Sequence, residues 1–297
     1  LGPILGAQHT MSRGLLTLTA QLFPISPMVE GPGRPTADSV LLELRKEGEP
    51  WTAVDTASVV APGFTATFKL REWEGVDPAS YRLTLLNRSE GAPNLPFVGT
   101  IRGEPGAETG AGASAQIFPG NSSTLPSGAS SGSSADPLPE DDFIVAAFTG
   151  NHIVASPGVD GGSFDWSRNL WFPHQDIVEH VRDQDPDFLF FSGDQVYEGA
   201  SPTRADFDHP YHDYLYKWYL WLWAFRDLTA DIPSVAIPDD HDVFHGNVWG
   251  AGGKATPPGL AGAEAQDQGG YKLPADWVNM VQRTQTSHLP EPWDPEA

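Results

Sequence analysis

The sequence predicts an antiparallel β-sandwich followed by an α/β domain. Residues 12–103 alternate apolar and polar side chains between Pro/Gly turns, which is typical of half-buried strands. From residue 140 onward, apolar runs alternate with helical patterns, which favours a mostly parallel sheet with helices on its faces. The stretch between them has almost no apolar bulk. We therefore divide the chain into a β-sandwich at 1–103, a linker at 104–139 and an α/β domain at 140–297.

The first domain contains several period-two runs. Leu16, Leu18 and Leu22 share one face of the first run, and Phe64 and Phe68 share one face of a later run. The predicted strands lie within residues 14–22, 39–51, 63–70, 80–87 and 97–105. Such spacing indicates a sandwich of the fibronectin or immunoglobulin kind. Because no catalytic cluster accompanies these runs, we expect this domain to have a packing or positioning role.

The segment 104–139 is rich in Gly, Ser, Ala and Pro. A segment of this composition buries too little apolar surface to offset the entropy lost on ordering. We interpret it as a flexible linker or an inserted surface loop.

The last part predicts three strands and two helices. The strands lie within residues 142–152, 186–197 and 232–244, and the helices span residues 171–184 and 211–228. The second helix is aromatic almost all round, which predicts that it is well buried. Lys217, Arg226 and its short length argue against a membrane span.

Each predicted strand of this domain is followed by polar residues that could bind a ligand. They are Asn151 and His152 after the first strand, Asp194 and Tyr197 after the second, and Asp239, Asp240, His241 and Asp242 after the third. Ligands of open α/β sheets bind beyond the carboxyl ends of the strands, and neighbouring strands lie about 5 Å apart. We therefore expect these side chains to converge on one small volume.

Carboxylates crowded together cannot all ionise unless a cation compensates their charge. Oxygen ligands with His and Tyr suit Fe, Mn, Zn, Mg or Ca. A carboxylate at a rigid strand end, such as Asp194, could bridge two such ions. Taken alone, Gly193-Asp194 is more often just a turn or a helix cap, and residues 239–242 fit a solvated turn as well as a metal site. The combination at successive strand ends favours a metal site.

Composition narrows the function classes. There are 39 acidic and 17 basic residues and a formal net charge of −22, so the surface repels nucleic acid and anionic membranes. The absence of Cys excludes disulfides, zinc–thiolate sites and cysteine nucleophiles. No run is long enough to span a bilayer, and "LGPILGAQHT" has no signal-peptide pattern. We expect either a processed mature form or a fragment of an extracytoplasmic protein (periplasmic or secreted), whose gene product continues beyond residue 297.

Two stretches, "FFSGDQVYEG" and "IPDDHDVFHGN", resemble the second and third motifs of the PhoD-like alkaline phosphatases, a branch of the calcineurin-like metallophosphoesterases. The resemblance implies a β-sandwich followed by the front portion of a metallophosphoesterase-like domain that is incomplete at its C-terminus. It also implies that Asp194 bridges two metals, that Tyr197 binds a ferric ion and that Asp240 replaces a metal-binding Asn. His241 would then act at the substrate phosphate.

A third stretch, "NMVQRTQTSHLPEPWDP", resembles the family segment that supplies a further ligand before a Leu-Pro pair. The match points to His288, with Asn279 as the other option. Two departures stand out: this chain has no Cys for the family's first motif, and it ends before the late His motifs of the superfamily. Thr149, Asn151, His152 or water would then take the place of the Cys.

These inferences predict hydrolysis of phosphate mono- or diesters by a water that two metal ions activate (Fe, Ca, Zn or Mn). The candidate metal ligands are Asn151, His152, Asp194, Tyr197, Asp239, Asp240 and His288. The candidate catalytic residues are His241 and Asp242, with Asp242 orienting His241. Two alternatives remain: a secreted, acidic, Ca-binding adhesion module, and a degenerate, inactive phosphoesterase.

Overall fold

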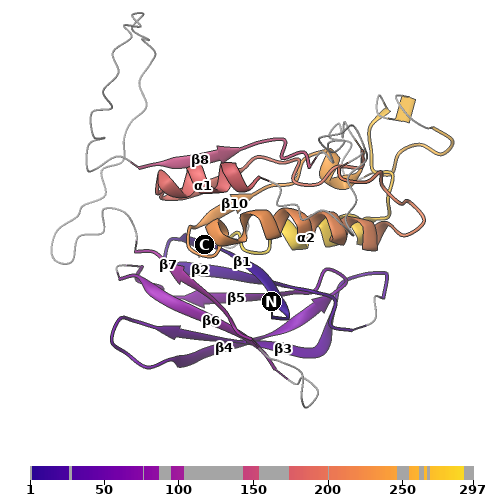
Figure 1. Ribbon diagram of the computed structural model, residues 1–297. Coiled ribbons are helices and arrows are strands. Elements are labelled where there is room, and N and C mark those ends of the chain that lie inside the picture. Colours follow the sequence, from indigo (N-terminus) through magenta and orange to yellow (C-terminus); the bar gives the residue numbers. More distant parts are fainter. Residues whose placement is uncertain are drawn as a thin grey trace, which may run out of the picture.

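A computed structural model of the chain shows two sheets with helices between them (Figure 1). It describes residues 2–26, 29–75, 77–86, 95–103, 143–153, 174–199, 201–245, 254–260, 264–265 and 268–290. The predicted linker at 104–139 lies outside the described residues. None of the described helices is both long enough and apolar enough to cross a membrane.

The N-terminal part forms one antiparallel sheet of seven strands, in the order β1-β2-β5-β4-β3-β6-β7. The strands are β1 (Ile4–Ser12), β2 (Leu15–Leu22), β3 (Arg34–Arg45), β4 (Thr52–Ala61), β5 (Thr65–Arg71), β6 (Ala79–Leu85) and β7 (Phe97–Ile101). Strands β4 and β5 are joined through a single pair of described residues, Val60 and Thr65. The edge strands β1 and β7 contact each other. The sheet therefore curls over on itself (Figure 1).

This arrangement refines the prediction of a sandwich. The antiparallel strands are confirmed, but one continuous sheet replaces the two separate sheets that a sandwich requires. Two strands, β1 and β4, were not predicted as strands. β4 alternates poorly because most of its residues from Thr52 to Ser58 are exposed. β2 is buried along its whole length, since its polar residues also face packed structure.

The C-terminal part contains a parallel three-stranded sheet in the order β10-β9-β8. Its elements are β8 (Val145–Phe148), α1 (Gln175–Asp183), β9 (Phe188–Phe191), α2 (Pro210–Thr229), β10 (Ser234–Ala236), the 3₁₀ helix η1 (His241–Val243) and α4 (Ala275–Thr286). Phe148, Phe191 and Ala236 are aligned across the three strands, so all three strands end at one edge. The alternation of strands and helices agrees with the predicted α/β organisation.

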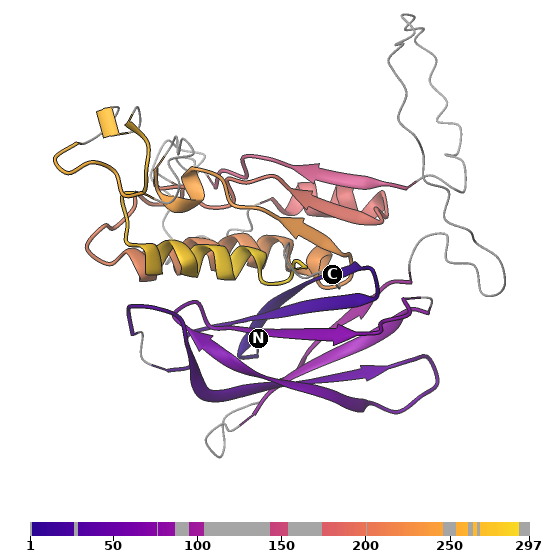
Figure 2. The ribbon, with the colours of Figure 1, turned by 180° about the vertical axis from the view of Figure 1, so that it is seen from behind.

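The two parts share one hydrophobic core. Helices α2 and α4 lie between the two sheets in both views (Figures 1 and 2). The rings of Trp218 and Trp221 stack with centroids 4.8 Å apart and are fully buried. The Trp218 indole N–H donates to the side chain of Gln21 on β2 at 2.9 Å, and the Tyr81 hydroxyl donates to the carbonyl of Ala230 at 2.9 Å. The antiparallel sheet thus supports the helices that lie under the parallel sheet.

Candidate metal centre

Two loops meet beyond the carboxyl ends of β9 and β10. Gly193 follows β9 with a φ of +107°, and a Cβ built there would lie 2.4 Å from the Cβ of Asp239. Only glycine allows this backbone conformation and this close approach. The next residue, Asp194, has a φ of +58°, so the loop turns sharply as it leaves the strand.

The buried carboxylate of Asp242 joins these loops. One of its oxygens accepts hydrogen bonds from the backbone N–H groups of Asp194 (2.8 Å) and Asp239 (2.9 Å). The other accepts from the backbone N–H of Val196 and from the side chain of Gln285, both at 2.9 Å. Burial raises the pKa of Asp242 to about 7, and these donated hydrogen bonds oppose the rise by favouring the carboxylate.

The role predicted for Asp242 is therefore corrected. Its contacts are with backbone N–H groups of both loops and with Gln285, whereas the imidazole of His241 pairs with Glu198. Asp242 is fully buried and orders the loops that carry the candidate ligands.

Helix α4 supports Asp242 from below. The amide nitrogen of Gln285 also donates to the Tyr214 hydroxyl at 3.2 Å, and that hydroxyl shares a hydrogen bond of 2.7 Å with Thr284. The oxygen of the Gln285 amide accepts from Gln195 at 3.2 Å. This network is buried, and it connects helices α2 and α4 to both strand-end loops.

Asp194, Asp240 and His241 form the cluster most suited to a cation. One potential ligand atom from each lies within 4.8 Å of the others. One oxygen of Asp194 accepts from the Tyr197 hydroxyl at 3.0 Å, while the other is buried without a hydrogen-bond partner in the described part of the chain. Burial raises the pKa of Asp194, and the charges of Asp240 and Asp239 contribute to the rise. A cation would relieve both the repulsion and the lost hydrogen bond.

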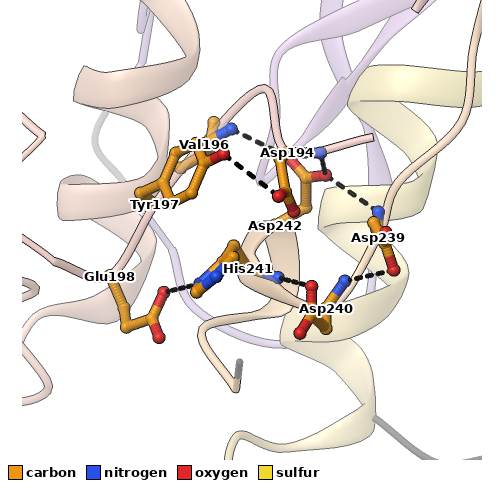
Figure 3. A network of polar contacts seen from close by, with 8 residues as sticks. All are labelled: Asp194, Val196, Tyr197, Glu198, Asp239, Asp240, His241 and Asp242. Atoms are coloured by element: carbon orange, nitrogen blue, oxygen red, sulfur yellow. Dashed lines mark hydrogen bonds and ion pairs between the residues drawn. The ribbon is translucent and has the colours of Figure 1, made fainter. Parts of the chain in front are cut away.

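His241 lies in an aromatic and acidic setting (Figure 3). Its Nδ1 is 2.7 Å from a carboxylate oxygen of Glu198, and its ring centroid is 4.6 Å from that of Tyr197. The hydrogen bond to Glu198 raises the pKa of His241 to about 9, with further help from Asp194 and Asp240. Burial acts to raise the pKa of Glu198, but hydrogen bonds, first that from His241, lower it below its usual value.

The residues after β8 lie against the same side chains. The ring of His152 contacts Tyr197 edge-on, with centroids 4.6 Å apart, and burial and the charge of His241 lower its pKa. A Cβ built at Gly150 would lie 3.1 Å from the Tyr197 hydroxyl. Beside it, the side-chain oxygen of Asn151 is buried and has no hydrogen-bond partner among the described residues. The predicted convergence of the three strand ends is therefore present.

Two predicted ligands are placed differently. Asp239 is exposed, and its carboxylate accepts from the backbone N–H of Asp240 at 2.8 Å. His288 is fully buried against β1, where its carbonyl accepts from the Thr10 hydroxyl, and near Ser234 at the start of β10. The start of a parallel strand lies at the opposite end of the sheet from the cluster. The assignment of His288 as a ligand is therefore corrected, and Asn279, the other option, is exposed on α4.

Sequence reasoning missed Glu198 and Gln285. Glu198 directly follows Tyr197 in the quoted motif, so its position was a signal, but its partner is 43 residues further along the chain. Gln285 has no sequence signal, because an amide on a helix is common and only packing brings it to Asp242.

Comparisons with known proteins add little to this geometry. No protein-family model matches the chain, and no curated protein matches it. Among solved structures, one titled "Structure of PhoD" matches at 14% identity and a TM-score of 0.47. The match covers 97% of this chain and 46% of that one, so the chain spans somewhat less than half of the structure's length. At this identity and TM-score, the likeness carries no argument about function, which must rest on the site.

Proposed function

We propose that the protein is a metal-dependent phosphoester hydrolase whose centre is built on Asp194 and Asp240. The observation that carries the proposal is the cluster at the shared carboxyl edge of β9 and β10, where one buried oxygen of Asp194 has no hydrogen-bond partner among the residues that the structure describes. The motif resemblance of these loops supplies the reaction class. We propose phosphate monoesters and diesters as the substrates. We also propose that the protein is extracytoplasmic and that its domains are divided at residues 103 and 139.

The donor set fits a hard or borderline cation. Carboxylate oxygens of Asp194 and Asp240, the hydroxyl of Tyr197 and the side-chain oxygen of Asn151 suit Fe, Zn, Mn or Ca. His152 is a further candidate, because its ring lies against Tyr197. We propose that Asp194 bridges two ions. A bound ion of this kind supplies Lewis acidity and lowers the pKa of a coordinated water.

Other residues of the site would act on the substrate or on the loops. A positively charged His241 could stabilise the phosphate oxygens or donate a proton to the leaving group. Asp242 would keep Asp194 and Asp239 at fixed backbone positions, so the ligand geometry is preorganised before the substrate arrives. This assignment leaves His241 as a catalytic residue, as the motif predicts.

The test combines metal analysis with turnover on one sample. The chain is stripped of metal and reloaded separately with Fe, Zn, Mn or Ca, and each sample is assayed with p-nitrophenyl and bis-p-nitrophenyl phosphate. We expect the wild-type protein to bind metal tightly and to hydrolyse at least one of the two esters. Both metal binding and hydrolysis should be lost in Asp194→Asn. Both should be retained in the control Asp208→Asn, which changes an exposed carboxylate. Bound metal without turnover on either ester would refute hydrolysis and favour the Ca-binding module or the inactive form. Absence of bound metal would refute the whole proposal.

A further inference from the structure

We propose that Lys217 is a positioning residue that, through the ring of Phe244, fixes the turn carrying Asp240 and His241. The inference rests on the proposed function for the metal that this turn would bind, and it adds a residue that acts through another side chain. Lys217 belongs to helix α2, whereas the turn after β10 includes η1 and ends at Phe244.

Lys217 is a lysine buried in an ion pair. Its side chain is 1% exposed, and its Nζ lies 2.9 Å from a carboxylate oxygen of Asp213, one helical turn earlier. Neither of these two atoms has a hydrogen-bond partner of suitable geometry in the part of the chain that the structure describes. Burying such a pair costs desolvation, and apolar residues in its place often give equal or greater stability. Stability alone therefore does not account for the pair.

A second neighbour of the ammonium group is an aromatic ring. The Nζ of Lys217 lies 5.0 Å from the centroid of the Phe244 ring, within the range of a cation–π interaction. Phe244 is fully buried, and its ring also packs on that of Trp277 with centroids 5.0 Å apart. The backbone of Phe244 has a φ of +57°, a left-handed conformation that a bulky residue rarely adopts without support from its surroundings. Lys217 on α2 and Trp277 on α4 provide such support.

Phe244 ends the turn that carries two residues of the candidate metal centre. Its backbone N–H donates to the carbonyl of His241 at 2.9 Å, and the backbone N–H of His245 donates to the carbonyl of Asp240 at 3.2 Å. Asp240 and His241 belong to the cluster suited to a cation. Because these hydrogen bonds close the turn, the backbone of Phe244 determines where the side chains of Asp240 and His241 start. Loosening the ring of Phe244 should therefore loosen the ligand geometry through the backbone.

The test removes the charged pair and keeps apolar volume in its place. Lys217→Met alone would leave the nearly buried carboxylate of Asp213 without its cation, so the main variant combines Lys217→Met with Asp213→Leu. Phe244→Leu is the second variant, since it keeps an apolar side chain but removes the ring face. The matched control is Arg226→Met, which removes a cation that lies 5.4 Å from the centroid of the Trp223 ring, near the C-terminal end of the same helix.

The first measurement is backbone amide exchange of the metal-free protein, followed by mass spectrometry of its peptides. We expect residues 240–245 to exchange about 10- to 30-fold faster in the double variant and in Phe244→Leu, because each change removes the contact that holds the turn. Exchange in strand β2 should change by less than about threefold, and Arg226→Met should match the wild type in both regions. Wild-type exchange at 240–245 in both variants, or equal acceleration in β2, would overturn the inference.

The second measurement is the Kd for whichever of Fe, Zn, Mn and Ca the wild type binds most tightly, determined by competition with a chelator. We expect the Kd to rise about 10-fold in the double variant and in Phe244→Leu. Combining all three substitutions should raise it no further, because Lys217 acts through Phe244. An unchanged Kd in both variants, or losses that multiply on combination, would overturn the inference. If the wild type binds none of the four metals, the proposed function fails, and amide exchange alone decides whether Lys217 holds the turn.

Discussion

The protein should lose stability in mild acid because two neutral histidines are buried where its two halves meet. His9 on β1 and His288 after α4 are both fully buried, and contacts with backbone groups of Thr229 and Ser234, respectively, only partly offset that burial. Burial, followed by the charge of Arg102, lowers the pKa of His9 to about 4. Burial, followed by the charge of His9, lowers the pKa of His288 to about 3. The ring of Tyr81 also lies edge-on to that of His9, with ring centroids 6.3 Å apart.

The sign follows from comparing folded and unfolded chains. In the folded chain, the pKa values of both histidines lie below the value of 6.5 in the unfolded chain. At a pH between the folded and unfolded pKa values, the two histidines therefore bind more protons in the unfolded chain than in the folded chain. The two neutral histidines leave the free energy of unfolding at its full value above pH 6.5. That free energy decreases as the pH falls from 6.5 toward the pKa values of the folded chain. At pH ~5 the gap from 6.5 is about 1.5 units, which at about 1.4 kcal/mol per unit is about 2 kcal/mol for each histidine. Because pH ~5 lies above both folded values, this figure depends little on them.

The assay is urea unfolding, followed by tryptophan fluorescence, at about pH 5 and pH 7. The measured quantity is the difference between the free energies of unfolding at the two pH values. We expect this difference to shrink by about 2 kcal/mol in His9→Gln and in His288→Gln, relative to the wild type. His212→Gln, at an exposed position on α2, is the control and should leave the difference unchanged. Equal differences in the wild type and both core variants would refute the reasoning.

Two further substitutions test the strand-end loops, both by urea unfolding. Gly193→Ala forces a Cβ to 2.4 Å from that of Asp239 at a φ of +107° and should lower the free energy of unfolding by about 2–3 kcal/mol. A Cβ at Gly199 meets no atom of the described residues within 4 Å, so Gly199→Ala should change the free energy of unfolding by less than about 0.5 kcal/mol. Equal effects of the two alanines would contradict the steric argument. Asp242→Asn retains one acceptor oxygen for four donors and should cost about 3 kcal/mol or more, against little change in the exposed Asp208→Asn. A wild-type-like Asp242→Asn would show that the loops do not depend on the carboxylate.

Much of the fold could be predicted from local patterns. Strands were predicted correctly where apolar residues alternate, as at Leu16, Leu18 and Leu22, and where they form short runs, as at 188–191 and 234–236. The types of residue in these stretches indicate burial on one or both faces of a strand. β4 was missed because consecutive residues from Thr52 to Thr56 are exposed on both faces of the strand, so apolar and polar residues do not alternate there. The single curled sheet could not be predicted, since strand pairing depends on contacts between distant segments.

The sequence by itself determined which residue types stand at the strand ends. Asp194, Asp240 and His241 follow apolar runs, and the carboxyl ends of parallel strands share one edge, so their convergence follows from topology. Only the tertiary structure decided which partner each of them takes. Glu198 contacts His241, and Gln285 contacts Asp242. His288 lies near the start of β10, away from the cluster. These positions depend on how helices α2 and α4 pack between the two sheets (Figure 1). Periodicity along one segment reports burial, whereas a hydrogen bond between segments requires the positions of both in space.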